Sequence, residues 1–397
     1  MDKQQEMNSE LHLIIIWHSA KNHFEFILNT LKSQFMIMGV YEIFWDEESY
    51  VDNLTKFYSH SQFHLNQFRM KRMFQGKAKY CGIGSFYLIV FKDNLPVYAD
   101  RSTSGGMRKV NTNIFDRKQE FRTLTGGGHK IHATDSQKET NKDITLLLGK
   151  NIHDYLESHT AWDNEIMSIR RNVTGVGGYG SLASFFYVLN SSLDYVVLRN
   201  FEDYPENYSS REHGDIDLLV NNLRLIQYLS GATKVYKRKH RVHYKLKING
   251  SDVFFDFRHI GDEYYDKNWE EAILNNRILM DKSFYIPDES NHYYSLLYHA
   301  LLHKPFLSQS YEEKLLRKSS PVNHENSNSK SGGVLFQDLD KFMKEHGFRY
   351  VIPKDISVYF NKNNIKPSTM LSFSIRRSIR QLIVDFRLNL AKFIRRR

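Results

Sequence analysis

Strand-like and helix-like hydrophobic patterns follow one another along the first part of the chain. The apolar run LHLIIIW (11–17) predicts a buried strand, and HFEFILNTLKSQFMIMG (23–39) predicts an amphipathic helix. Further strands are predicted at YEIFW (41–45) and at SFYLIVF (85–91), which is followed by a turn at KDNLP. This order of elements favours a small α+β domain in which helices pack on one sheet.

A second region begins at the glycine-rich TGVGGYGS (174–181), after a segment at 144–172 that is predicted to be helical or a linker. It continues with a predicted helix at 182–190 and a predicted strand at 195–201, and HGDIDLLV (213–220) then begins another apolar strand. Farther on, KVYKRKHRVHYKLKI and VFFDFRHI flank a turn at NGSD and predict a β-hairpin.

From about residue 289 the hydrophobic pattern predicts helices, as in NHYYSLLYHALLH (291–303). A Ser- and Asn-rich stretch near 318–333 is predicted to be a mobile loop. We therefore expect a mixed α+β protein with four parts. Their predicted bounds are 1–150 for a first domain, 151–288 for a second, 289–370 for a helical region and 371–397 for a tail helix.

The tail repeats apolar residues at helical spacing, and basic residues occupy its other faces. The apolar positions are Ile375, Ile379, Leu382, Ile383, Phe386, Leu390 and Phe393. A basic amphipathic helix of this kind favours the surface of an anionic membrane. Docking of the same helix on the protein's own core is the alternative.

Composition narrows the class of protein. Hydrophobic residues make up 41% of the 397 residues, which excludes wholesale disorder, and the single Cys81 excludes a disulfide framework or a cysteine-based zinc site. Neither a secretory signal nor a membrane-spanning stretch is found, so we expect a cytoplasmic protein that is peripheral to the inner membrane face. The net charge of +10 is concentrated in the tail, which makes nucleic acid the least favoured partner.

Two aspartates interrupt the apolar strand of HGDIDLLV. Asp215 and Asp217 project to one side of a strand and Ile216 to the other, because strand side chains alternate. Their repulsion is costly unless another charge compensates it. A divalent cation, Mg²⁺ or Mn²⁺, supplies that charge, and Asp256 on the predicted hairpin offers a third carboxylate as ligand or base. The alternative is that the pair only ends a loop.

A glycine-rich turn and helix, a strand, the two aspartates and a third acid on a later strand follow each other in this order. The order resembles the nucleotidyltransferase fold of the DNA-polymerase-beta-like superfamily. The resemblance implies a central domain with a mixed sheet, in which Asp215, Asp217 and Asp256 bind the metal and are catalytic.

Candidate nucleotide contacts lie close to the aspartates in the sequence. Arg199 and Asn200 stand where that family has a Gly-Ser pair, whereas GYGS (178–181) lies farther upstream. Arginine and asparagine can contact phosphate by charge and by hydrogen bonding. Gly214 directly precedes the aspartates, and Lys304 is a further candidate for a phosphate contact.

A histidine pair and a basic segment each allow both a structural and a functional interpretation. His299 and His303 are spaced i, i+4 and could bind metal, but a packed or solvated pair is favoured. The basic segment KRKHRVHYKLK is either a solvated strand face or a surface for an acidic substrate.

The segment GGGHKIHATDSQKETNKDITLLLG (126–149) resembles the active-site segment of nucleoside diphosphate kinases. By that resemblance His132 is the phosphorylated catalytic histidine, Glu139 is the glutamate of the following helix, and Arg108 in SGGMRKVN contacts phosphate. The similarity spans most of residues 11–149 and implies a ferredoxin-like fold for the first domain.

This first domain departs from the kinase family at its phosphate contacts. Trp17 and His18 stand where the family has Lys-Pro-Asp, His129 replaces an asparagine and Ala133 replaces a glycine. Loss of the lysine removes a charge from the transferring phosphate. The domain is then a derived relative that binds nucleotide, catalyses an altered phosphotransfer or serves as a scaffold. A hydrogen-bonded core histidine is the alternative for His132.

Together these features predict a magnesium- or manganese-dependent enzyme of nucleotidyltransferase type. We expect it to transfer a nucleotidyl or phosphoryl group from a nucleoside triphosphate to a small acceptor, such as a sugar or alditol phosphate, by analogy with bacterial surface-polysaccharide pathways. One alternative is a nucleoside-diphosphate-kinase-like phosphotransferase acting through His132. Another is a catalytically silent nucleotide-binding protein at the membrane.

Overall fold

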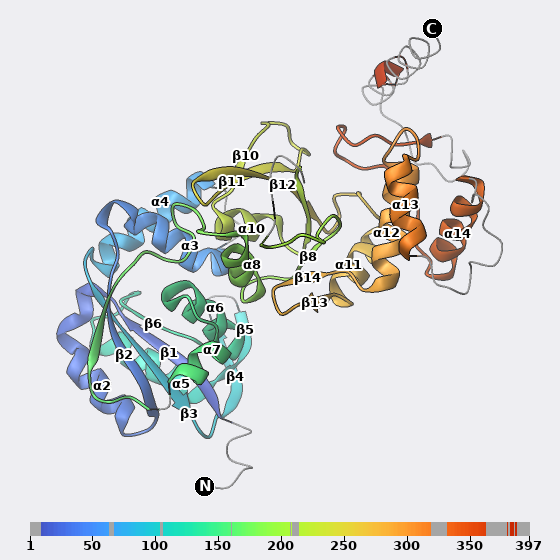
Figure 1. The fold of residues 1–397 in the computed structure, drawn as a ribbon. Coiled ribbons are helices and arrows are strands. Elements are labelled where there is room, and N and C mark those ends of the chain that lie inside the picture. Colours follow the sequence, from blue (N-terminus) through green and yellow to red (C-terminus); the bar gives the residue numbers. More distant parts are fainter. Residues whose placement is uncertain are drawn as a thin grey trace. The chain divides into compact units, whose positions relative to one another are not determined.

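The computed structural model describes most of the chain. The described residues are 9–62, 67–103, 106–159, 161–206, 208, 214–318, 332–362, 379, 382–384 and 386. They form two compact units (Figure 1): unit 1 comprises 1–192 and 224–231, and unit 2 comprises 193–223 and 232–397. Both units combine helices with small sheets, which confirms the predicted mixed α+β class.

Unit 1 contains a five-stranded sheet. Its strands are β1 (Glu10–Ile16), β2 (Met36–Phe44), β3 (Phe86–Asp93), β6 (Ile131–Ala133) and β7 (Ile166–Arg170). They lie in the order β6-β1-β3-β2-β7, and all neighbours are antiparallel except β7, which runs parallel to β2. Six of the seven residues of β1 are buried, which explains why its sequence is a continuous apolar run and does not alternate.

Helices α2 (Phe24–Lys32) and α5 (Thr112–Leu124) contribute to one apolar core together with β1 and β3. The buried residues of α2 recur at helical spacing: Phe24, Ile27, Leu28 and Leu31. The predicted helix over 23–39 is wrong in its second half, because β2 begins at Met36. There Ile37 and Met38 are buried as part of a strand that pairs with β3 along its length.

The other elements of unit 1 surround this core. They are η1 (His18–His23), η2 (Glu47–Ser49), α3 (Tyr50–Gln62), α4 (Gln67–Cys81), β4 (Tyr98–Thr103), β5 (Gly106–Asn111), α6 (Gln137–Leu148), α7 (Ile152–Ser158), α8 (Leu182–Asn190) and α10 (Leu223–Ser230) apart from its first residue. The segment at 144–172, which was expected to be helical or a linker, also contains the edge strand β7. Most side chains of β7 are exposed, so its sequence shows none of the alternation that marks a half-buried strand.

Lys56, on α3, has a buried ammonium group. Its Nζ lies 3.3 Å from the Thr174 carbonyl oxygen and 3.3 Å from the Tyr179 hydroxyl oxygen, and burial lowers its pKa to about 7. Between that pH and the ordinary lysine pKa of about 10.4, the unfolded chain binds more protons than the folded chain, so stability rises with pH. We expect Lys56→Met to remove this rise, which amounts to up to about 1.4 kcal/mol per pH unit.

The measurement is denaturant unfolding of wild type and variant at several pH values across that window. Lys79→Met, at an exposed position of α4, is the matched control and should keep the wild-type pH dependence. Equal slopes for wild type and Lys56→Met would show that the Lys56 ammonium group is hydrated.

Unit 2 is built on a second five-stranded sheet. Its strands are β8 (Tyr195–Val197), β9 (Ile216–Val220), β10 (Thr233–Lys234), β11 (His243–Ile248) and β12 (Ser251–His259). They lie in the order β10-β11-β12-β9-β8; β9 and β12 are parallel, and the other neighbours are antiparallel. The predicted hairpin is confirmed as β11 and β12, and the φ angles of 48° at Asn249 and 74° at Gly250 suit a type I′ turn.

Helices dominate the rest of unit 2, as predicted for the region from 289. The elements are α11 (Lys267–Asn275), β13 (Ile278–Met280), β14 (Phe284–Ile286), α12 (Glu289–Leu302), α13 (Gln309–Lys318) and α14 (Gly332–Glu345). Helix α12 packs against α13 and α14 (Figure 1), and a core rich in aromatic residues, including Trp269 and Tyr298, joins them to the sheet through Leu219.

Two predicted segments lie largely outside the described residues: the loop near 318–333 and the tail at 371–397. In the described part of the tail, Ile379, Leu382 and Phe386 are helical, and their exposed fractions are 54%, 66% and 68%. Within the described chain, none of the helices is long and apolar enough to cross a membrane.

Candidate active site

Strands β9 and β12 bring three aspartates to neighbouring positions. Asp217 and Asp256 are paired across these parallel strands, and Asp215 directly precedes β9. Ile216 is fully buried, whereas the Asp215 side chain is 47% exposed and that of Asp217 is 14% exposed. Strand alternation thus separates the apolar residue from the two acids. The structure brings these three sequence-predicted residues together.

His243, the first residue of β11, stands opposite Asp256 in the hairpin. Its Nδ1 lies 3.0 Å from Asp256 Oδ1 and 3.3 Å from Asp215 Oδ2. Donor atoms of His243, Asp215 and Asp256 all lie within 4.8 Å of one another, so these three side chains could hold a metal ion together. His243 is not among the residues expected from the sequence, although the register of the predicted hairpin places it opposite Asp256.

Arg199 neutralises part of this negative charge through an ion pair with Asp217. Its Nη2 lies 2.9 Å from Asp217 Oδ1 and donates to the Tyr264 hydroxyl oxygen at 2.9 Å. The same hydroxyl lies 2.6 Å from His299 Nδ1. The Arg199 side chain is only 6% exposed, and charge-assisted bonds are strong where water is excluded. For His299 and His303, both buried, the packed alternative describes what is observed.

Arg258, on β12, is another buried cation that contacts the aspartate group. Its Nη2 lies 3.3 Å from Asp256 Oδ2, and its Nη1 lies 3.7 Å from a carboxylate oxygen of Asp262 and 3.7 Å from one of Asp355. Its guanidinium also stacks over the Tyr264 ring, 4.3 Å from the centroid. Asp256 therefore has its Oδ2 oriented by Arg258 and its Oδ1 turned toward His243.

The three carboxyl groups differ in how readily they ionise. Burial raises the pKa of Asp215, and the charge of Asp256 adds to this rise although His243 opposes it. Burial also raises the pKa of Asp217 in spite of Arg199. For Asp256 burial acts in the same direction, but the hydrogen bond with His243 and the charge of Arg258 outweigh it and hold the pKa at about 2. A further cation would stabilise the charged forms of Asp215 and Asp217.

Three other residues of unit 2 were predicted to contact the nucleotide: Lys304, Asn200 and Gly214. Burial lowers the pKa of Lys304, Arg199 lowers it further and Asp217 opposes both, so its ammonium is within electrostatic range of that pair. Asn200 has a φ of 56°, and its amide oxygen accepts a hydrogen bond from the Lys314 ammonium at 2.7 Å. Gly214 has a φ of 69°, which favours glycine.

His132, in unit 1, lies on β6 and is held by a buried carboxylate. Its Nε2 is 2.8 Å from Asp143 Oδ2, and Asp143 Oδ1 is 2.9 Å from the Lys142 ammonium. The rings of Phe57 and Tyr58 meet the imidazole edge to face. Asp143, which the sequence analysis did not single out, is therefore the carboxylate that orients His132.

The other predicted residues of unit 1 differ in their surroundings. Glu139 accepts a hydrogen bond from the Asp135 backbone N–H at 2.8 Å, as in a helix cap, although a donor atom of its carboxylate also lies within 4.8 Å of those of His132 and Asp143. Arg108 is exposed on β5. Trp17, at the position of the family's lysine segment, is fully buried.

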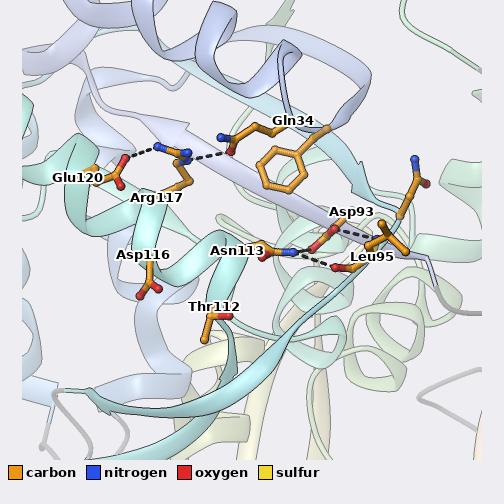
Figure 2. A pocket seen from close by; sticks show the side chains of 10 residues that line it. Gln34, Asp93, Leu95, Thr112, Asn113, Asp116, Arg117 and Glu120 are labelled. Atoms are coloured by element: carbon orange, nitrogen blue, oxygen red, sulfur yellow. Dashed lines mark hydrogen bonds and ion pairs between the residues drawn. The ribbon is translucent and has the colours of Figure 1, made fainter.

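A cavity of about 610 Å³ in unit 1 lies beside α5 and the turn after β3 (Figure 2). Arg117 Nε donates to the Gln34 amide oxygen at 2.8 Å and its guanidinium also contacts Glu120, while Asn113 Nδ2 donates to Asp93 at 3.0 Å (Figure 2). Several of these polar groups are engaged with one another, and we assign the cavity no function.

Comparison with known proteins found no similar protein. No protein-family model, no curated protein and no solved structure matches the chain. The chemistry of unit 2 therefore has to follow from its own residues.

Proposed function

We propose that unit 2 is a metal-dependent nucleotidyltransferase. The observation that carries the proposal is the grouping of Asp215, Asp217 and Asp256 on neighbouring parallel strands, next to His243 and the buried Arg199. Three carboxylates in so small a volume require cations, and their oxygens are the ligands that Mg²⁺ and Mn²⁺ prefer. The residues present thus fit a divalent cation bound together with a nucleotide phosphate.

In the proposed reaction, an oxygen of a small phosphorylated acceptor forms a bond to the α-phosphorus of a nucleoside triphosphate. The bond from that phosphorus to the bridging oxygen breaks, and pyrophosphate leaves. A bound cation would neutralise phosphate charge. Arg199 and Lys304 would stabilise the charge of the phosphates, and Asn200 and Gly214 would line the nucleotide. Asp256, which is ionised at neutral pH, would hold the cation, and the proton of a hydroxyl acceptor would pass to water.

A second candidate activity belongs to unit 1. Apart from the intervening α3, α4, β4 and β5, the elements follow the order β1-α2-β2-β3-α5-β6, and both helices contribute to one core. This is the order expected of a ferredoxin-like fold, and it supports kinship with nucleoside diphosphate kinases. With Nε2 held by Asp143, the Nδ1 of His132 is the atom that could take the γ-phosphoryl group as the nucleoside diphosphate leaves. Since Trp17 replaces the family's lysine segment, we propose nucleotide binding or a scaffold role for unit 1 and place the main chemistry in unit 2.

We also propose that the tail at 371–397 holds the protein at an anionic membrane surface. The exposed apolar side chains of Ile379, Leu382 and Phe386 support this, because their spacing places them on one face of a helix. A silent nucleotide-binding protein at the membrane would share these features but would not release pyrophosphate.

Calorimetric titration with each of the four nucleoside triphosphates, with and without Mg²⁺, tests the assignment of the active site. We expect Mg²⁺-dependent binding to wild type that weakens by at least about tenfold, or 1.4 kcal/mol, in Asp215→Asn/Asp217→Asn. Asp252→Asn is the matched control, because this partly exposed β12 carboxylate pairs with Lys245 at 2.7 Å and Lys247 at 2.9 Å and lies outside the aspartate group.

His132→Ala separates the two candidate activities. Binding that survives His132→Ala and fails in the aspartate variant places the nucleotide in unit 2. Loss of binding with His132→Ala alone would move the chemistry to unit 1 and would contradict the proposed function of unit 2.

A further inference from the structure

The Nδ1 atom of His243 faces two carboxylate oxygens at once. It forms a hydrogen bond with Asp256 Oδ1 at 3.0 Å and an ion-pair contact with Asp215 Oδ2 at 3.3 Å. A single N–H can align with only one of these two acceptors, because hydrogen bonds weaken steeply away from linearity. The donor atoms of the three side chains all lie within 4.8 Å of one another, so one cation could bind all of them, which a single proton on the ring cannot do.

The imidazole ring of His243 is held in this orientation by its neighbours. Phe254 stacks on it with a centroid separation of 5.4 Å and an interplanar angle of 3°, and Tyr236 stacks on it at 5.7 Å and 30°. Arg258 holds Asp256 through its Oδ2 atom, so the Oδ1 atom of Asp256 is directed toward His243. Such outer contacts are what orients the ligands of a metal site.

The distances also match a metal site. Two adjacent ligands about 2.1 Å from the centre of an octahedral cation lie about 3.0 Å apart. The separations of 3.0 Å and 3.3 Å from Nδ1 to the two carboxylate oxygens are of this size. One imidazole nitrogen with two carboxylate oxygens is a mixed donor set, and imidazole favours transition metals over the harder Mg²⁺.

We infer that His243 is a metal ligand together with Asp215 and Asp256, and that the site selects Mn²⁺ over Mg²⁺. This inference rests on the proposed function in that the cation is the one used for nucleotidyl transfer. It replaces the expected set of three aspartates by two aspartates and a histidine, with Asp217 engaged by Arg199.

Titration of the full chain with Mn²⁺ alone, followed by the electron paramagnetic resonance of free Mn²⁺, tests the ligand set. We expect His243→Gln to weaken Mn²⁺ binding by at least about tenfold, the loss that removal of even an outer-shell partner causes, and to weaken Mg²⁺ binding much less. His240→Gln, at an exposed position of the same basic segment, is the matched control and should bind Mn²⁺ as wild type does.

A spectroscopic measurement on wild type avoids dependence on the folding of a variant. Electron spin-echo modulation of bound Mn²⁺ should show coupling to a ¹⁴N nucleus, which should persist in His240→Gln and vanish in His243→Gln. Bound Mn²⁺ without nitrogen coupling, wild-type affinity in His243→Gln, or equal affinity of wild type for Mn²⁺ and Mg²⁺ would each overturn the inference.

These outcomes are distinguishable from failure of the proposed function. Nucleotide binding that depends on the aspartates but not on His243 leaves nucleotidyl transfer in place and removes His243 from the ligand set. Nitrogen-coupled Mn²⁺ in a chain that binds no nucleotide retains the metal site and rejects the transferase.

Discussion

Replacement of Arg258 by methionine should destabilise unit 2 by about 3–5 kcal/mol, the usual result of removing one partner from a buried ion pair. The Arg258 side chain is 4% exposed, and it contacts Asp256, Asp262 and Asp355. Methionine preserves much of the volume but leaves buried carboxylates without their cation. Asp355 would keep Arg241, at 3.5 Å, and Asp256 would keep His243, at 3.0 Å, so the larger penalty falls on Asp262.

Denaturant unfolding, combined with hydrogen exchange of the β9 and β12 amides, measures this effect. A loss of about 3 kcal/mol corresponds to roughly a hundredfold faster exchange through global opening.

Adding Asp262→Asn to Arg258→Met should recover part of the loss, because the second change removes one of the stranded charges. Arg277→Met is the control: its pair with Asp194 is partly exposed, so we expect about 1 kcal/mol or less. A similar loss for both arginines would mean that burial does not decide the effect.

The sequence pattern predicted one part of the aspartate group from a short-range rule, because strand alternation places Asp215 and Asp217 on one side. Asp256 was expected as the third acid through the nucleotidyltransferase resemblance, and in the structure the long-range parallel pairing of β9 with β12 puts it beside Asp217. His243 also followed from a short-range rule and was nevertheless missed. In a hairpin whose two-residue turn is Asn249-Gly250, counting outward from Ile248 and Ser251 reaches His243 and Asp256 as partners.

Other features depend on contacts that no local pattern encodes. Arg258 meets Asp355 across almost a hundred residues of sequence, and Tyr264 links Arg199 to His299 on a later helix. The helix predicted over 23–39 failed for a related reason: the apolar run from Phe35 onward suits a buried strand and a buried helix equally, and pairing with β3 decides between them.

Asp215→Asn should reduce nucleotidyl transfer by at least about a hundredfold, as expected when a charge that stabilises the transition state is removed. The same change should leave the free energy of unfolding unchanged or slightly higher. Burial and the charge of Asp256 raise the pKa of Asp215 above its value in the unfolded chain, so ionisation at neutral pH opposes folding. Asparagine keeps the shape and cannot ionise, and the gain is small because the side chain is 47% exposed.

The combination of the two effects distinguishes a functional carboxylate from one that merely ends a strand. Pyrophosphate release measures transfer, and denaturant unfolding measures stability on the same preparations. Asp252→Asn, on β12, should show the opposite pattern: full transfer and a slight loss of stability, since it leaves the exposed Lys245 and Lys247 without their partner. An Asp215→Asn protein that transfers nucleotide normally, or that unfolds more readily than wild type, would identify the Asp215 carboxylate as structural. Functional sites are where a charge that opposes folding is expected, and the cation and phosphates of the proposed reaction would bind the Asp215 charge.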